Sequence, residues 1–153
     1  MTISGDDKKL TFVLLVDDDP FIHEMVASMI DDGKYSVVSA MNAADALKII
    51  AQETPDIIIT DALMPGESGY SLIHKIKTNP TTAHIPVILI TILEEPNGSV
   101  MDGSGMADFR VSKPLYLSDL TSVLEEANTL MEQRREISFD ITRNEIETVT
   151  IVF

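Results

Sequence analysis

The sequence predicts an α/β domain built on a doubly wound parallel sheet. Five short runs of apolar, β-prone residues alternate with segments whose apolar residues recur at helical spacing. The runs are continuously apolar, which indicates strands buried on both faces, as in a parallel sheet. Parallel neighbours need crossover connections, and these are right-handed, so helices are expected on both faces of the sheet.

The first strand and helix are predicted on either side of an acidic segment. The apolar run over residues 11–16 ends abruptly in the carboxylates of residues 17–19. Pro20 suits the first turn of a helix, because proline lacks an N–H that this turn would leave unbonded. Asp19 is the expected N-cap, and apolar residues at helical spacing continue to a stop at residues 31–33.

The next units repeat this arrangement. A strand over residues 35–39 precedes a helix over 42–52, for which Asn42 is the expected N-cap. A strand over 56–61 precedes a helix through Leu72, Ile73 and Ile76. Strands over 86–91 and near 109–111 follow, and a last helix is predicted from about 118 to 134. The glycine-rich segment 96–105 predicts a short or distorted fourth crossover helix, since each glycine costs roughly 1 kcal/mol relative to alanine.

Composition excludes several classes of function. The 153 residues include 25 Asp+Glu and 11 Lys+Arg, a net charge of −14, which argues against nucleic acid as a direct partner. With no cysteine, a disulfide scaffold, a thiolate metal site and a cysteine nucleophile are excluded. There is no signal-peptide pattern at the start and no apolar stretch near the ~20 residues that span a bilayer, so we expect a soluble, cytoplasmic protein.

Five polar side chains follow the predicted strands at one edge of the sheet. Asp17 and Asp18 follow the first strand, and Asp61, Thr91 and Lys113 end the third, fourth and fifth. Clustered carboxylates repel one another, and a hard divalent cation such as Mg²⁺ would offset this repulsion. The hydroxyl and ammonium groups suit a phosphoryl group. Asp61 begins the loop of the central strand, so it is the expected nucleophile toward phosphorus, forming an aspartyl-phosphate.

These motifs resemble the receiver domain of two-component response regulators, of the chemotaxis-regulator type. The resemblance covers roughly residues 10–134 and is carried by segments 15–20, 56–65, 89–91 and 112–114. It implies a flavodoxin-like, five-stranded parallel sheet of order 2-1-3-4-5 flanked by five helices. It also implies a phosphoacceptor signalling domain that assists its own phosphotransfer and dephosphorylation and is not otherwise an enzyme.

The resemblance further implies roles for the strand-end residues. Asp18, Asp61 and the backbone carbonyl of Leu63 would bind Mg²⁺ directly, and Asp17 would act largely through water or a hydrogen bond. A phosphohistidine on a sensor histidine kinase or phosphotransfer protein would donate the phosphoryl group to Asp61. Thr91 and Lys113 would contact its oxygens, and the altered surface would change the affinity for a downstream effector protein or an output domain.

Three positions differ from the usual family pattern, namely Ile92, Met106 and Arg110. Ile92, Arg110 and the weak fourth helix favour an alternative in which the chain is a phosphorylation-independent pseudo-receiver that acts as an interaction or dimerisation module. A Mg²⁺-dependent phosphohydrolase is a weaker alternative, because its usual nucleophile motif does not match residues 17–21. The histidines His23, His74 and His84 follow no common strand end, and ordinary surface roles are expected for them.

The ends of the chain lie outside the expected receiver. Residues 1–9 are expected to be an N-terminal tail. Residues 136–142 and 146–153 are β-prone on either side of a turn candidate, so residues 135–153 are expected to form a β-hairpin extension or the start of a truncated output domain. An isolated hairpin is marginally stable in water, so it should pack on the domain, form a homodimer or belong to that further domain.

Overall fold

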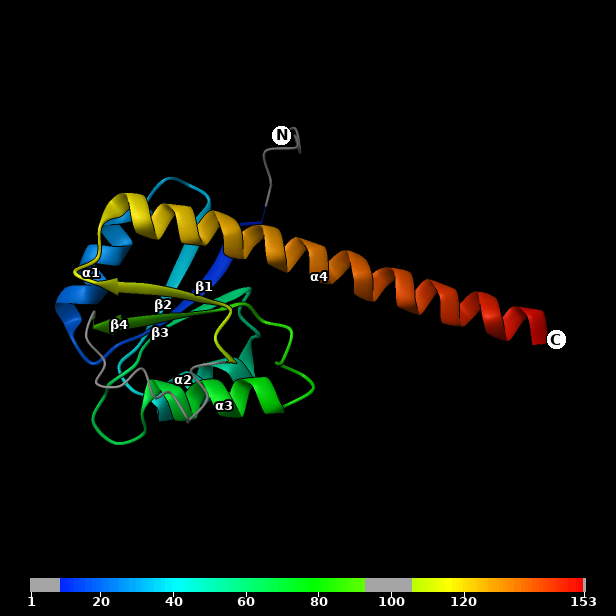
Figure 1. The fold of residues 1–153 in the computed structure, drawn as a ribbon, viewed down its shortest axis with the longest axis horizontal. Coiled ribbons are helices and arrows are strands. Elements are labelled where there is room, and N and C mark those ends of the chain that lie inside the picture. Colours follow the sequence, from blue (N-terminus) through cyan, green and yellow to red (C-terminus); the bar gives the residue numbers. More distant parts are fainter. Residues whose placement is uncertain (1–8, 93–105, 153) are drawn as a thin grey trace.

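A computed structural model describes residues 9–92 and 106–152 of the chain. Its five-stranded sheet has the order β2-β1-β3-β4-β5, and every neighbouring pair is parallel, which confirms the predicted class and order (Figure 1). The strands are β1 (Thr11–Val16), β2 (Tyr35–Ala40), β3 (Ile57–Asp61), β4 (Val87–Ile92) and β5 (Phe109–Lys113). The strand order reverses between β1 and β3, and this reversal is where open α/β sheets form binding sites.

Helices cover both faces of the sheet. The helices are α1 (Pro20–Met29), α2 (Ala43–Gln52), α3 (Gly69–Thr78) and α4 (Leu117–Val152). Figure 1 shows α1 and α4 on one face and α2 and α3 on the other. Alternate residues of a strand point to opposite faces, so Leu14 joins the core under α2 and α3, and Leu15 joins the core under α1 and α4. The predicted fourth crossover helix falls in 96–105, outside the described residues.

Side-chain caps fix where the first helices begin. The Asp19 carboxylate accepts a hydrogen bond from the backbone N–H of Phe21 at 2.9 Å, and the Asn42 amide oxygen accepts one from Asp45 at 2.8 Å. Both caps were predicted, and each satisfies a backbone donor that the first helical turn leaves unbonded. The Asp19 cap therefore fixes the turn between β1 and α1, and this turn contains the acidic residues 17–19.

The predicted C-terminal hairpin is wrong over the described residues 135–152. α4 continues without a break from Leu117 to Val152, and its C-terminal part extends beyond the sheet (Figure 1). Residues 136–152 would reach about 25 Å at the rise of an α-helix. Extending an existing helix avoids the costly nucleation step, whereas an isolated two-stranded hairpin is marginal. No helix in the described ranges combines the length and apolarity of a membrane span.

Two consecutive arginines fasten α4 to the amino-terminal edge of the sheet. Arg134 donates to Asp108 at 2.8 Å and to the His84 carbonyl at 2.9 Å, and Arg135 pairs with Asp56. Each aspartate also accepts a backbone N–H at the start of a strand, at 2.8 Å from Val87 for Asp108 and 2.7 Å from Phe12 for Asp56. The helix is therefore tied to both the β1 and β4 ends of the sheet.

Arg134→Met should lower the free energy of unfolding by about 1–3 kcal/mol, because it removes a charge-assisted, partly buried hydrogen bond to Asp108 and an exposed one to the His84 carbonyl. Burial acts to raise the pKa of Asp108, but the hydrogen bonds from Lys77 and Arg134 outweigh it and hold that pKa below its usual value. Urea denaturation measures the change, with Lys48→Met on the exposed side of α2 as control. Equal stability of the two variants would show that Arg134 does not anchor the helix.

Candidate functional site

Three carboxylates meet at the carboxyl edge of the sheet. Asp17 and Asp18 follow β1 and Asp61 ends β3, and one ligand oxygen from each lies within 4.8 Å of the other two. Asp17 and Asp61 are buried, and Asp18 is exposed. The sequence predicted this cluster, and the parallel pairing of β1 with β3 brings it together.

Asp17 is held in place, and one of its carboxylate oxygens accepts no hydrogen bond within the described part of the chain. Its backbone N–H donates to the Ala40 carbonyl at 3.1 Å, and its Oδ1 accepts from the backbone N–H of Asp19 at 2.9 Å. Its Oδ2 is buried and has no hydrogen-bond partner among the described residues. A buried acceptor without a partner is costly, so this oxygen suits a hard cation.

A lysine from the fifth strand lies beside these acids. The Lys113 Nζ is 3.2 Å from Asp61 Oδ1 and 3.7 Å from Asp17 Oδ2. Its ammonium therefore offsets part of the negative charge and stands where an anion bound to Asp61 would meet it.

The two remaining predicted residues lie on the neighbouring segments. Thr91 is buried in β4, directly after Ile90, which pairs with Asp61, and Ile92 beside it is 49% exposed. Leu63 lies two residues after Asp61, and its side chain points to solvent, so only its backbone could serve the cluster. All the predicted strand-end positions thus lie along one edge.

Burial raises the pKa of Asp61 above its ordinary value. The charge of Asp17 raises it further, and Lys113 lowers it in part. The folded chain then holds this proton to higher pH than the unfolded chain does, so ionisation of Asp61 lowers stability as pH rises from the unfolded pKa through the folded pKa. The loss of folding stability caused by ionised Asp61 is complete above its folded pKa.

Asp61→Asn should therefore raise the melting temperature of the metal-free protein at pH 7, and this gain should shrink as pH falls through the folded pKa of Asp61. Thermal denaturation in chelator from pH 4 to pH 8 measures the effect. Asp31→Asn, at an exposed carboxylate, is the control. A lower melting temperature for Asp61→Asn at pH 7 would contradict this electrostatic account.

Sequence reasoning missed two residues that support the cluster. His23 was expected at the surface, but it is buried, and its Nε2–H donates to the Asp17 carbonyl at 2.7 Å. Its spacing from Val26 and Ile30 could have placed it on the inner face of α1. Gly69 begins α3, and a Cβ there would lie 1.9 Å from the backbone oxygen of Asp61. No local sequence pattern predicts that the backbone of Gly69 lies so close to the backbone of Asp61.

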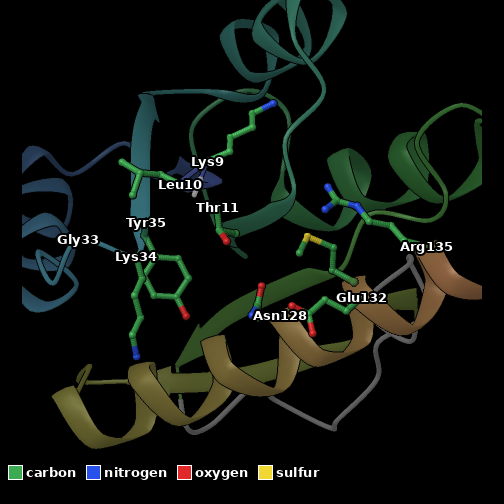
Figure 2. A pocket seen from close by; sticks show the side chains of 10 residues that line it. Lys9, Leu10, Thr11, Gly33, Lys34, Tyr35, Asn128, Glu132 and Arg135 are labelled. Atoms are coloured by element: carbon green, nitrogen blue, oxygen red, sulfur yellow. The ribbon is translucent and has the colours of Figure 1, made fainter. Parts of the chain in front are cut away.

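A separate cavity of about 440 Å³ lies between α4 and the amino-terminal ends of β1 and β2 (Figure 2). Figure 2 shows the Tyr35 ring and the Asn128 and Glu132 side chains among its walls. Burial raises the pKa of the Tyr35 hydroxyl. None of the predicted site residues lines this cavity, so it is distinct from the carboxylate cluster.

The sheet order and the carboxylate edge are those of a receiver domain. Residues 13–125 match the family described as the response regulator receiver domain, and the chain belongs to that family. It is 39% identical over 105 residues to the response regulator PleD of Caulobacter vibrioides, covering 67% of this chain and 23% of PleD. Protein PilH of Pseudomonas aeruginosa is 27% identical over 119 residues, covering 78% of this chain and 96% of PilH.

Solved structures agree with this assignment. The signal receiver domain of a histidine kinase from Syntrophus aciditrophicus superposes with a TM-score of 0.72 at 31% identity, covering 78% of this chain and 90% of that one. The chemotaxis protein CheY4 of Vibrio cholerae gives 0.70 at 25% identity, covering 78% and 99%. The chain spans 23% of PleD and 49% of the regulatory protein PhoB of Pseudomonas aeruginosa, so it corresponds to one part of those longer proteins.

Proposed function

We propose that this receiver domain accepts a phosphoryl group on Asp61 from a phosphohistidine of a sensor histidine kinase or phosphotransfer protein, with Mg²⁺, and thereby switches its protein–protein interactions. The observation that supports this proposal best is the cluster of three carboxylates within 4.8 Å, with the Lys113 ammonium 3.2 Å from Asp61. This set of groups combines a nucleophilic oxygen, cation ligands and an anion contact at one edge of the sheet.

The residues present fit Mg²⁺. We assign the ligands to Asp18, Asp61 and the backbone carbonyl of Leu63, with the orphaned Oδ2 of buried Asp17 acting directly or through water. Oxygen donors of this kind are what Mg²⁺ prefers. The ion, when bound, supplies positive charge that offsets carboxylate repulsion and the charge of the phosphoryl oxygens.

In the proposed transfer, an Asp61 carboxylate oxygen forms a bond to phosphorus as the bond from phosphorus to the donor imidazole nitrogen breaks. The bonding pair stays on that nitrogen, and the donor ring, whose other nitrogen carries a hydrogen, leaves as neutral imidazole. Lys113 pairs with one phosphoryl oxygen and Thr91 donates its hydroxyl hydrogen to another. Water later attacks the acyl phosphate, which returns the Asp61 carboxylate and inorganic phosphate.

The proposed output is a change of partner. We assign the receiver to residues 10–134, and we propose that the remainder of α4 connects it to an effector protein, a further output domain or a second copy of the chain. We propose that this activity takes place in the cytoplasm. The net charge of −14 argues against direct contact with nucleic acid. Thr91, Lys113 and the carboxylate cluster together give the phosphorylation-independent alternative no support.

The proposal is tested by incubating the wild-type chain with Mg²⁺ and a small acyl phosphate and measuring its intact mass. We expect an adduct of about 80 Da, the mass of one phosphoryl group, which chelation of the metal prevents. A wild-type chain that stays unmodified under these conditions would refute the proposed phosphorylation.

A further inference from the structure

We propose that His23 is a positioning residue that holds Asp17, and with it the acidic turn, in the geometry that a divalent cation requires. The inference rests on the proposed function of the carboxylate cluster. It concerns a side chain on α1 that touches neither the phosphoryl group nor the cation. Its role would be exerted entirely through the backbone of Asp17.

The contact between the two residues is short and buried. His23 is 9% exposed, and its Nε2 lies 2.7 Å from the backbone carbonyl oxygen of Asp17, six positions earlier in the chain. A carbonyl only accepts, so Nε2 carries the hydrogen and donates it. The Nδ1 atom is buried without a partner among the described residues, and a proton there would be unpaired. The geometry therefore places the donating hydrogen on Nε2.

Asp17 is then fixed at three points. Its N–H donates to the Ala40 carbonyl at 3.1 Å, its carbonyl accepts from His23, and its Oδ1 accepts from the Asp19 N–H at 2.9 Å. The first contact extends the β1–β2 pairing, and the third lies within the turn itself. His23 supplies the contact that fastens the turn to α1.

These contacts decide which oxygen faces the cluster. With the other polar groups of Asp17 engaged, its Oδ2 is the oxygen left for a cation, 3.7 Å from the Lys113 ammonium. Without the imidazole N–H, the Asp17 carbonyl would lose its partner and the peptide to Asp18 could rotate toward solvent. Both carboxylates would then move, because they flank that peptide. Groups that orient metal ligands commonly change metal affinity by 10–100-fold.

If His23 only filled space in the core, its replacement would affect Mg²⁺ binding differently. An apolar side chain of similar size would then keep the metal affinity, and the presence of an N–H donor would make no difference. His23→Leu and His23→Met remove the donor and keep an apolar side chain. His23→Gln keeps a donor on a side chain that can reach the same carbonyl. His74→Leu, at the exposed histidine of α3, is the matched control.

The experiment measures Mg²⁺ affinity by calorimetry, and hydrogen exchange of the Asp19 amide in the metal-free protein. We expect His23→Leu and His23→Met to weaken Mg²⁺ binding about tenfold and to speed exchange of the Asp19 amide, and His23→Gln to stay within about threefold of wild type. His74→Leu should change neither. If one of the two apolar variants does not fold, the other is compared with His23→Gln.

Two results would overturn the proposal. One is wild-type Mg²⁺ affinity in an apolar variant, and the other is a His23→Gln variant as impaired as His23→Leu. A wild-type chain that does not bind Mg²⁺ would instead refute the proposed metal site. The exchange rates of the metal-free variants would then still decide whether His23 holds the turn.

Discussion

Asp61→Asn will take up no phosphoryl group from a small acyl phosphate in the presence of Mg²⁺, whereas the wild-type chain will gain about 80 Da. The amide is a poor nucleophile toward phosphorus, and it also removes one negative charge from the cation ligands. The substitution is nearly isosteric, so the buried position keeps its packing. We expect the loss of adduct in intact-mass spectra to be complete at times when the wild type is fully labelled.

The comparison needs a variant that changes charge without touching the cluster. Asp31→Asn removes an exposed carboxylate at the end of α1 and should be labelled at the wild-type rate. Circular dichroism on both variants shows that each is folded before labelling. A mass gain on Asp61→Asn equal to that of the wild type would assign the phosphoryl group to another residue and remove Asp61 from the mechanism.

Gly69→Ala should disturb the site, because the added methyl group would clash with the backbone of Asp61. A Cβ at this position would lie 1.9 Å from the backbone oxygen and 2.9 Å from the backbone carbon of Asp61, and 3.1 Å from the Ala62 Cα. These are backbone atoms, so neither partner can turn aside. We expect a loss of about 1–3 kcal/mol in the free energy of unfolding, as for overpacked positions, and slower labelling of Asp61.

Gly66→Ala separates this clash from ordinary loop strain. Gly66 lies in the loop that precedes α3, with φ of 82°, and a Cβ there would meet nothing within 4 Å. Alanine at that φ costs about 1 kcal/mol but does not push on Asp61. Urea denaturation and labelling rates should therefore show a stability loss in both variants and slow labelling only in Gly69→Ala. Equal labelling in the two variants would contradict the close approach of α3 to Asp61.

The local sequence determined the architecture and most of the site. Short, continuous apolar runs of β-prone residues, such as residues 11–16, are typical of strands covered on both faces, and such strands form a parallel sheet with helices on each side. In such a sheet the carboxyl ends of the strands share one edge, so Asp17, Asp61 and Lys113 had to meet there. The N-caps Asp19 and Asn42 could also be predicted from the sequence, because an N-cap side chain bonds only to the backbone two or three residues away.

The tertiary structure decided what depends on residues distant in the chain. The alternating β-prone residues after residue 136 predict a strand when they are considered alone. The helix that precedes them is already nucleated, and Arg134 and Arg135 anchor it to Asp108 and Asp56. The backbone therefore continues as helix. His23 and Gly69 became part of the site for a similar reason. Their contacts with Asp17 and Asp61 are made by packing α1 and α3 against the sheet edge, and local periodicity carries no information on such approaches.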